Sequence, residues 1–376
     1  MANILITGGA GFIGSNLALQ LLSRGHRLRI MDNLSEQIHG DYTNSPLYQS
    51  IIGKVEFIKG DVRERTDWEK CLAGQEIVVH LAAETGTGQS MYEIEKYVDV
   101  NVKGTGIMLD ILANQEHSIQ KVVVASSRSI YGEGKYECKE HGVVYPGNRE
   151  DKLLADAQFE PTCPTCREEV RLLFTDEESK IHPSSIYGIT KQNQEQMVLV
   201  ACKSIGIAAV ALRYQNVYGP GQSLTNPYTG ILSIFSTRLL NQNPINVFED
   251  GKESRDFVYI DDVVAATIAC IERDAANHQV FNVGSGEVTS VAQVAAALKA
   301  AYQSEVEVSV SGDYRLGDIR HNVADISKAR DILGFKPQVM FEEGIKRFSD
   351  WVKQQEVEED KYEASLEEMK RKGLMK

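Results

Sequence analysis

The sequence has no long apolar run and no excess of basic side chains. Its apolar stretches stay well short of the roughly 20 residues that a membrane-spanning helix needs, so we expect no membrane association. Lys and Arg together number 40, against 53 Asp and Glu, which gives a net charge of −13. A general nucleic-acid-binding protein would need a basic face, so this balance argues against nucleic acid as a partner. The N-terminus enters an apolar strand pattern without a signal peptide, and we therefore expect a cytoplasmic protein.

Cysteine is also scarce, with six residues in a chain of 376. In a cytoplasmic protein these should be free thiols or metal ligands, because reducing conditions disfavour disulfides. Cys71, Cys202 and Cys270 lie in apolar or helical contexts, so we expect them in the core.

The other three cysteines belong to a polar segment, residues 133–180, that interrupts the regular pattern of the chain. It contains Cys138-x-x-His141, then 21 residues, then Cys163-x-x-Cys166. This spacing predicts a four-ligand tetrahedral zinc site, and the metal would supply the core that a polar insert lacks. Since protein would occupy all four positions, the zinc would be structural. The alternative is an irregular loop with three incidental thiols and a solvated histidine.

The N-terminal stretch NILITGGAGFIGSNL, residues 3–17, has the strongest functional signal. A short apolar strand is followed by four glycines within seven residues and then by an amphipathic helix. This arrangement binds a dinucleotide pyrophosphate, because glycine allows close backbone approach and the helix N-terminus attracts the anion. The glycines fit two spacings, Gly9-Gly11-Gly14 and Gly8-Gly11-Gly14. A tight strand-to-helix turn without a ligand is the alternative.

Asp32 closes the next apolar strand, eighteen residues after Gly14. We expect its carboxylate to bind the adenine ribose hydroxyls and to repel a 2′-phosphate, which favours NAD over NADP. A helix cap in the following turn is the other interpretation of this residue. Strand patterns at 55–58, 77–81 and 121–125 then alternate with helical ones, including a long helix over 91–114. The alternation predicts a parallel sheet with helices on both faces.

The segment SSIYGITKQNQEQ, from Ser184, places Tyr187 and Lys191 one helical turn apart on the same face. A nearby ammonium and a positively charged nicotinamide would lower the phenol pKa from its usual value near 10. Tyr187 is therefore a candidate general base, with Lys191 also placed to hold the nicotinamide ribose. Alone, Tyr-x-x-x-Lys is usually an ordinary helix surface; after a glycine turn and the strand end Ser126-Ser127 it indicates catalysis.

Taken together, these motifs resemble the extended short-chain dehydrogenases/reductases, within the NAD-dependent nucleotide-sugar epimerase/dehydratase family. The matching segments run in family order over about 340 residues, and they are TGGAGFIG, DN at 32–33, GDV at 60–62, HLAA at 80–83, NVKGT at 101–105, SSRSIYG at 126–132, YGITK at 187–191, RYQNVYGPGQ at 213–222, RDFVYIDD at 255–262, FNVGSG at 281–286 and RLGDIRH at 315–321. Only the insert and the tail after about Glu356 lie outside the pattern. A local departure is Gln215, where the family commonly has Phe.

The resemblance implies roles for individual residues. Ser127 would hydrogen-bond the sugar hydroxyl, Tyr187 would be the base and Lys191 its partner. The implied cofactor-binding residues, besides Tyr187 and Lys191, are Gly8, Gly11, Phe12, Ile13, Gly14, Asp32, Asn33, Asp61, Val62, Leu81, Ala82, Ala83, Asn101 and Tyr214. The implied substrate-binding residues are Thr85, Ser127, Asn216, Val247, Arg255 and Arg315. Asp256, Asp261 and Asp262 are interpreted as structural ties and a helix cap.

The implied fold is α/β: a Rossmann-type doubly wound parallel sheet, a smaller α/β C-terminal substrate domain and the Cys/His insert at 133–180. We expect the NAD-binding domain at 1–215, with 245–275 returning to it. The substrate domain would take 216–244 and 276–356. Residues 357–376 are charged and are expected to be an exposed helix or frayed tail without a chemical role. We expect a homodimer.

The reaction expected is epimerisation of a nucleotide-diphosphate sugar. Dehydratases of the family carry Asp-Glu directly after the residue matching Ser127, whereas this chain has Arg128 and Ser129. Within the family, residues 80–93 and 226–235, the insert and the C-terminal region most resemble the dTDP-L-rhamnose 4-epimerases, and polar Thr85, Thr87 and Gln89 would lie near the nicotinamide. The alternatives are a UDP-hexose 4-epimerase, another dehydratase, decarboxylase or reductase of the family, or an NAD-binding regulator.

Overall fold

The computed structural model describes residues 1–226, 228 and 230–376; Pro227 and Thr229, within the segment 226–235 named above, lie outside the described residues. A seven-stranded sheet in the order β14-β9-β5-β4-β1-β2-β3 forms the centre of the larger domain, and all its pairings are parallel. Its strands are β1 (Asn3–Thr7), β2 (Arg27–Asp32), β3 (Glu56–Lys59), β4 (Ile77–His80), β5 (Lys121–Ser127), β9 (Ala208–Tyr214) and β14 (Gln279–Val283). The predicted doubly wound parallel sheet is confirmed.

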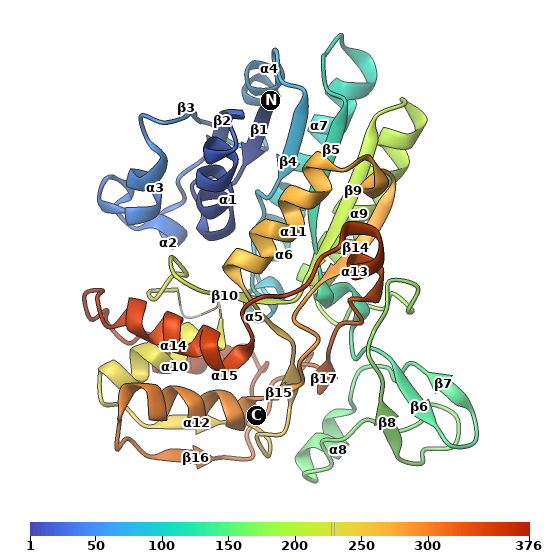
Figure 1. Cartoon of the computed structure of the whole chain (residues 1–376). Coiled ribbons are helices and arrows are strands. Elements are labelled where there is room, and N and C mark those ends of the chain that lie inside the picture. The colour runs from blue at the N-terminus through green and yellow to red at the C-terminus, as the bar shows by residue number, and fades with distance from the viewer. Residues whose placement is uncertain (227, 229) are drawn as a thin grey trace.

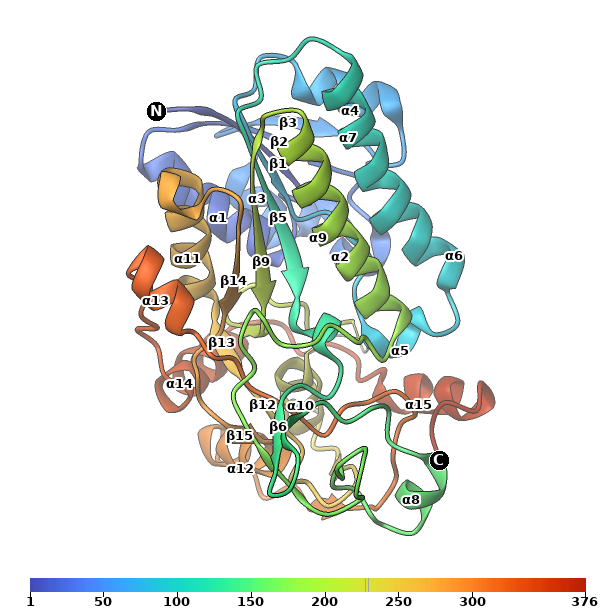
Figure 2. The same ribbon diagram turned by 90° about the vertical axis from the view of Figure 1, so that its right-hand side faces the viewer.

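Each strand of the sheet is buried on both faces, since its side chains alternate between two apolar layers. In β1, Ile4 and Ile6 join one cluster of buried side chains and Leu5 joins the other. The first layer includes side chains from α1 (Phe12–Ser23) and α11 (Ile260–Glu272), with α3 (Pro46–Ile51) beside α1. The second includes α4 (Arg65–Leu72), α7 (Gly104–Asn114) and α9 (Ile186–Ser204). Figure 2 shows α1 and α11 on one side of the sheet and α7 and α9 on the other. Cys71, Cys202 and Cys270 are buried in these layers, as predicted.

The helix expected over 91–114 is interrupted. Short α6 (Ile94–Tyr97) passes into a π-helical turn, Val98–Lys103, before α7 begins. The wide turn contains buried Asn101, whose amide oxygen accepts from the backbone N–H of Glu84 at 2.8 Å and whose amide nitrogen donates to Thr190 Oγ1 at 3.0 Å. Such turns are frequent at functional sites. Here the turn fixes the loop after β4 against α9. The short α2 (Glu36–His39) and α5 (Thr87–Ser90) follow β2 and β4.

The smaller domain lies beyond the carboxyl ends of the sheet strands (Figure 1). Its elements are β10 (Asn216–Tyr218), α10 (Ile231–Leu240), β11 (Ile245–Val247), β12 (Ser254–Arg255), β13 (Phe257–Tyr259), β15 (Thr289–Ser290), α12 (Val291–Tyr302), β16 (Val308–Val310), β17 (His321–Asn322) and α14 (Phe341–Val352). β10 pairs with β13, β11 with β16, and β12 with both β15 and β17.

The chain crosses between the domains at slightly different points from those predicted. Since β11 pairs with β16 in the smaller domain, the chain returns to the larger domain only at α11, which packs beside α1. β14 pairs with β9 in the large sheet, and α13 (Ser327–Leu333) packs against it, although 276–356 was assigned to the smaller domain. The rest of the predicted division stays a prediction. As expected, Asp256 and Asp262 are structural: Asp256 accepts from the backbone of Ser285 and Gly286, and Asp262 from that of Gln338 and Val339.

The insert forms its own small sheet, in which β6 (Tyr136–Cys138) pairs antiparallel with β7 (Gly142–Val144) and β8 (Val170–Leu172). Helix α8 (Asp151–Ala155) lies between β7 and β8 in sequence. Figure 1 shows the insert beside the smaller domain, on the same side of the large sheet. No helix among residues 1–226, 228 and 230–376 combines the length and apolar character required to cross a bilayer.

A buried group of charged side chains joins the insert to the smaller domain. Arg320 is fully buried, and its guanidinium lies 2.9 Å from Glu249 and 2.7 Å from Asp250. Arg149, from the insert, lies 2.7 Å from Glu249 and 3.2 Å from Glu133. Glu160, also from the insert, forms an ion pair with Arg320. The insert is therefore fixed by paired charges, and also by a small apolar cluster in which Leu154 and Phe159 pack with Tyr314.

The C-terminal segment is a helix, one of the two expected forms, but it is packed on the protein rather than exposed or frayed. Residues Tyr362–Arg371 form α15, and Tyr362, Leu366 and Met369 on one of its faces are buried. They pack with Met375 against Ile234 and Phe248. The high content of charged residues predicted a tail without packing contacts. In the structure these charges occupy the solvent face of an amphipathic helix, and its other face is buried.

Candidate active site

The glycine turn after β1 leaves no room for side chains. Gly8 has φ +67°, and a Cβ on it would lie 2.8 Å from the backbone nitrogen of Ala82. A Cβ on Gly14 would lie 2.5 Å from the carbonyl oxygen of Gly8. Helix α1 starts directly after Gly11, so the unpaired N–H groups of its first turn, at Phe12, Ile13 and Gly14, are available to an anion. A Cβ on Gly9 would also lie 2.6 Å from the Ile30 side chain, so Gly8, Gly9 and Gly14 are all needed and the turn satisfies both spacings.

A small pocket lies beside this turn, and Asp32 is part of its lining. The other lining residues are Gly11, Met31, Asn33, Ser35, Ile38, His39, Gly60, Val62, Ala82, Ala83, Glu84 and Val100. Asp32 also accepts backbone hydrogen bonds from Ala10 at 3.0 Å and Leu34 at 2.9 Å. The carboxylate thus both braces the loop and faces the pocket, so the two sequence interpretations of Asp32 are compatible. The glycines and alanines of this lining, with the Asp32 carboxylate at the end of β2, fit the adenosine end of NAD.

Of the other predicted cofactor residues, Gly11, Asn33, Val62, Ala82 and Ala83 also line that pocket, and one predicted residue lies instead within an apolar layer. The Asn33 amide donates to Asp61 at 3.3 Å, and Ala82 N–H donates to Thr7 Oγ1 at 3.2 Å. Burial opposes ionisation of Asp61, but hydrogen bonds from Arg63 and Asn33 outweigh it and lower the pKa of the carboxyl group. The exception is Tyr214, whose hydroxyl bonds Thr267 at 2.8 Å within the apolar layer on the α1 side. Its role toward the cofactor stays a prediction.

The predicted catalytic side chains meet at the carboxyl end of β5. Ser127 ends this strand, and its Oγ accepts from the backbone N–H of Ser129 at 3.2 Å. Tyr187 lies in the first turn of α9, and its backbone N–H donates to Ser90 Oγ at 3.1 Å. Burial raises the pKa of the Tyr187 phenol, while a hydrogen bond with Ser127 and the charge of Arg128 lower it. Burial prevails, so the phenol holds its proton more firmly here than the sequence analysis expected.

Lys191 is buried one turn further along α9, and its Nζ donates to Gln194 Oε1 at 2.7 Å. Burial lowers the pKa of the Lys191 ammonium to about 7, against the opposing effect of the Glu195 carboxylate. Lysine at this pKa exchanges protons readily near neutral pH. The Lys191 amine, which can exchange protons, therefore lies one helical turn from Tyr187 on the same helix.

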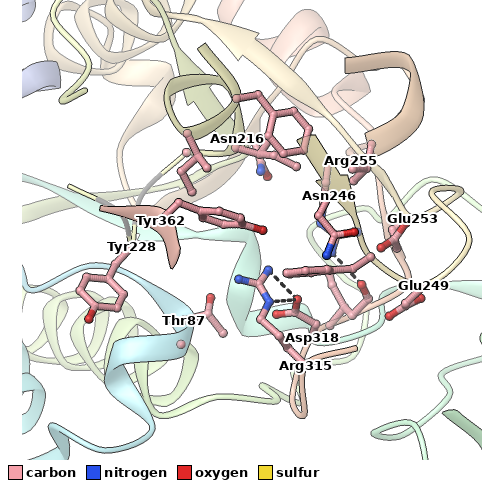
Figure 3. A pocket seen from close by; sticks show the side chains of 18 of the residues that line it. Thr87, Asn216, Tyr228, Asn246, Glu249, Glu253, Arg255, Arg315, Asp318 and Tyr362 are labelled. Carbon is pink, nitrogen blue, oxygen red and sulfur yellow. Dashed lines mark hydrogen bonds and ion pairs between the residues drawn. The ribbon is translucent and has the colours of Figure 1, made fainter. Parts of the chain in front are cut away.

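A larger cavity, of about 220 Å³, is lined by Arg128, the residue after Ser127, and by side chains of the smaller domain (Figure 3). Among its lining residues are Asn216, Arg255 and Arg315, as predicted. Arg255 donates to the backbone carbonyls of Ser254, Ile319 and Arg320, and Arg315 pairs with Asp318 at 2.7 Å. Guanidinium groups held in this way suit phosphate oxygens.

Sequence analysis missed Arg128 as a lining residue of this cavity and noted it only where a dehydratase has an acid. Its Nε donates to the Asn216 amide oxygen at 2.6 Å. Burial and the nearby Arg255 lower the pKa of Arg128 to about 9. An anion between these guanidiniums would relieve their repulsion. A basic residue directly after the catalytic serine was the available signal.

Three of the predicted substrate-side residues lie elsewhere. Val247 is buried in the core, and its strand neighbours Asn246 and Phe248 line the cavity instead, because successive strand side chains face opposite sides. Thr85 is exposed outside the cavity lining, and Thr87 takes that place. Gln89 is bound to Gln37 and Glu93. The other lining side chains that the sequence did not indicate come from α10 and α15, and they include Ile231, Ile234, Phe235, Tyr362 and Met369.

Within the insert, Cys138, His141, Cys163 and Cys166 are brought together, and their candidate ligand atoms all lie within 4.8 Å of one another. Cys138 Sγ lies 3.5 Å from His141 Nδ1 and 3.6 Å from Cys166 Sγ, and Cys163 Sγ lies 3.6 Å from His141 Nδ1. Tetrahedral zinc with Zn–S near 2.3 Å spaces its ligand atoms by about 3.5–3.8 Å. The predicted cluster is confirmed, and its donors fit this metal.

The sequence matches the NAD dependent epimerase/dehydratase family over residues 4–149 and 167–284. The chain belongs to this family. It is an NAD-dependent nucleotide-sugar epimerase, as the resemblance implied. The family match stops at residue 149 and resumes at 167, so much of the insert lies outside it.

Relatives of the epimerase cover nearly all of its length. It is 38% identical to dTDP-L-rhamnose 4-epimerase of Burkholderia thailandensis, over 94% of this chain and 95% of the relative. A putative UDP-glucose 4-epimerase of Methanocaldococcus jannaschii is 32% identical, over 93% and 98%. Among solved structures, UDP-glucose 4-epimerase of Thermotoga maritima with UDP-glucose has a TM-score of 0.76 and 29% identity, over 93% and 98%. UDP-glucuronic acid 4-epimerase of Bacillus cereus, with UDP-glucuronic acid and NAD, has 0.75 and 26%, over 94% and 99%.

The stability of the epimerase should depend on the proton of Glu253 at the edge of the cavity. Burial and the neighbouring Glu249 raise the pKa of Glu253 from 4.5 to about 7. Because the folded-state pKa is raised, the stabilising contribution of the protonated group is present below about pH 4.5 and is lost as pH rises through about 7. In Glu253→Gln this loss cannot occur, so the melting temperature of the variant should rise relative to wild type between pH 5 and pH 8.

Thermal denaturation at unit pH steps measures this difference, with exposed Glu305→Gln as the control. A constant offset between Glu253→Gln and wild type across the range would show that Glu253 is ionised throughout.

Proposed function

We propose that this epimerase interconverts dTDP-L-rhamnose and dTDP-6-deoxy-L-talose by inversion at C4. The observation that carries the proposal is the position of Arg128, which directly follows Ser127, acts on Tyr187 through its charge, and lines a cavity together with Arg255 and Arg315. The sugar would lie near Ser127 and Tyr187, and the diphosphate would lie between the guanidinium groups of the three arginines. The 38% identity to dTDP-L-rhamnose 4-epimerase over almost the whole chain supports the choice of sugar.

The proposed chemistry needs a base, a hydride acceptor and a way to return the hydride. NAD held at the glycine turn and Asp32 would supply the reversible hydride transfer that inversion at C4 requires. Tyr187 takes the proton of the C4 hydroxyl and later returns it, and Ser127 hydrogen-bonds the same oxygen. Lys191, whose pKa of about 7 lets it carry a proton near neutral pH, would favour the phenolate when it is charged.

The residues after Ser127 favour epimerisation over loss of water. Elimination across C5 and C6 needs a carboxylic acid and a carboxylate near the sugar. Arg128 occupies the first of these positions, and its guanidinium is engaged with Asn216. The segment after Ser127 therefore offers no carboxylate to a 4-keto sugar, which favours its reduction over loss of water.

A 6-deoxy sugar also needs an apolar contact for its methyl group. Helix α10 contributes Ile231, Ile234 and Phe235 to the cavity, which supplies such a surface. A UDP-hexose would place a hydroxyl group there instead. UDP-glucose nevertheless remains the second candidate, because the putative M. jannaschii relative is named for it and the T. maritima structure contains it.

Incubation with dTDP-L-rhamnose should yield dTDP-6-deoxy-L-talose, identified by NMR. In Tyr187→Phe the ring is kept and the proton-transfer group is lost, so turnover should fall by roughly 10²–10⁴-fold while NAD remains bound. Parallel incubation with UDP-glucose tests the alternative. If only UDP-glucose is inverted at C4, the enzyme is a UDP-hexose 4-epimerase and the proposed substrate is wrong. If Tyr187→Phe turns over normally, Tyr187 is not the base.

We also propose that the insert binds one structural zinc ion through Cys138, His141, Cys163 and Cys166. The distances between the ligand atoms support this, and so does the turn at Cys163, where its N–H donates to the carbonyl of Glu168 at 2.8 Å. All four positions around the metal are filled by protein, so its role would be to hold the insert together.

Elemental analysis of protein purified without a metal-binding tag or chelator should give about one zinc per chain. Cys163→Ser and Cys166→Ser should lose the metal, because a hydroxyl group is a poor zinc ligand. Cys71→Ser, far from the cluster in the large domain, is the matched control and should retain it. Wild-type protein that is free of zinc would reduce the cluster to neighbouring thiols.

A homodimer is the third part of the proposal. Ile94, Val98, Ile189 and Val200 are large apolar side chains exposed on α6, the π-helical turn and α9, and Val200 is 70% exposed. Although they are distant in the sequence, α6 and the π-helical turn both contact α9, so these side chains belong to one region of the surface. Burying such a face between two copies would remove apolar surface from water.

Light scattering should therefore give about twice the chain mass of 41.8 kDa. Val200→Glu should shift the mass toward the monomer, because it places a charge in the proposed interface. Val310→Glu, on β16 of the smaller domain, introduces the same charge at another exposed valine and should leave the mass unchanged. A monomeric wild type would contradict the proposal.

A further inference from the structure

The C-terminal segment, residues 360–376, is built into the wall of the substrate cavity. Tyr362 and Met369 from α15 are among its lining residues. Met369 reaches α5 on the catalytic side, where its Sδ lies 3.4 Å from the place a Cβ on Gly88 would take. Tyr362 lies at the opposite side, near Arg315, and Figure 3 shows its hydroxyl directed into the cavity.

Charged contacts hold α15 in this position. Arg238, itself 3% exposed, lies 2.9 Å from Glu363 and 3.3 Å from Asp360. Its guanidinium also lies 4.7 Å from the centre of the Tyr362 ring, a cation–π distance. At the other end of the helix, the Tyr228 hydroxyl donates to Glu368. The ring of Tyr362 is thus fixed from behind while its hydroxyl end faces the cavity.

The last residues of the segment pair with the chain that carries Arg315. Backbone hydrogen bonds join Tyr314 N–H to Lys376 O at 2.9 Å, Lys376 N–H to Tyr314 O at 3.0 Å, and Leu316 N–H to Leu374 O at 2.9 Å. Arg315 lies between the two flanking residues of this short ladder. Its guanidinium also lies 5.4 Å from the centre of the Phe248 ring. The segment therefore positions one of the cationic groups of the cavity as well as contributing a ring to it.

The order of groups along the cavity indicates what Tyr362 would contact. Arg128 is close enough to Tyr187 to lower the pKa of its phenol, Arg255 is the neighbour that lowers the pKa of Arg128, and Tyr362 is a neighbour of Arg315. A nucleotide-diphosphate sugar is linear, with the diphosphate between sugar and nucleoside. With the sugar at Tyr187 and the diphosphate at the arginines, the nucleoside must extend toward Asn246, Phe248 and Tyr362.

We infer that Tyr362 is a nucleotide-binding residue of this enzyme, supplied by the C-terminal segment and contacting the pyrimidine nucleoside. The inference rests on the proposed nucleotide-sugar function. The Tyr362 ring would stack on the base or ribose, with its hydroxyl free to accept or donate a hydrogen bond. A helix that the sequence presents as a charged tail thereby takes part in substrate recognition.

The test uses Tyr362→Leu, which keeps buried apolar volume on α15 but removes the aromatic ring. We expect the Kd for dTDP, measured by calorimetry, and the KM for the nucleotide sugar to rise about tenfold, equivalent to about 1.4 kcal/mol of aromatic contact. The kcat should stay near that of wild type, because the reacting atoms lie at the other end of the cavity. Tyr362→Phe should retain most of the affinity, since the ring remains.

Glu367→Ala, on the exposed face of the same helix, is the matched control and should bind dTDP as wild type does. Thermal melting of each variant shows whether a lower affinity comes from loss of the folded helix or from loss of the ring. If Tyr362→Leu does not fold, Tyr362→Phe, which keeps the ring, should still bind dTDP. Equal dTDP affinity in wild type and Tyr362→Leu would overturn the inference alone. Failure of wild type to bind either dTDP or UDP would overturn the nucleotide-sugar function and the inference with it.

Discussion

The substrate cavity depends on the buried ion pairs around Arg320. Three connections contribute its charged side chains: residues 127–133 after β5, residues 246–255 around β12, and residues 315–320 before β17. Arg320 pairs with Glu249 and Asp250, and its backbone N–H donates to Glu133 at 2.7 Å, so all three meet at one residue. Removing one partner from such a cluster leaves buried charges uncompensated, which costs about 3–5 kcal/mol.

This cluster also explains why an insert with its own small core affects the cavity. Arg149 and Glu160 come from the insert, and they complete the set of partners of Glu249 and Arg320. The Lys376 side chain, at the end of the C-terminal segment, pairs with Asp151 of α8. The insert and the C-terminal segment thus both brace the connection that carries Arg315, from opposite sides.

Burial governs the electrostatics of the catalytic end. It raises the pKa of the Tyr187 phenol and lowers that of Lys191 to about 7, so in this environment both groups favour their neutral forms. Ser127 and Arg128 act in the opposite direction on Tyr187. A bound nicotinamide cation and a diphosphate would change this balance by adding one positive and two negative charges to the same region.

The sequence by itself determined the parallel sheet, the glycine turn, the Cys/His cluster, and the meeting of Ser127 with Tyr187. Each of these rests on local chemistry: apolar runs that suit buried strands, glycines that alone fit a crowded turn, and spacings along one helix or one pair of turns. Only the tertiary structure decided that Val247 faces the core while Phe248 faces the cavity, since strand phase depends on the packed partner. Only it placed Arg128 beside Arg255, and Tyr362 beside Arg315. Those contacts join residues more than a hundred positions apart, and no local pattern encodes which distant surface an amphipathic C-terminal helix will cover.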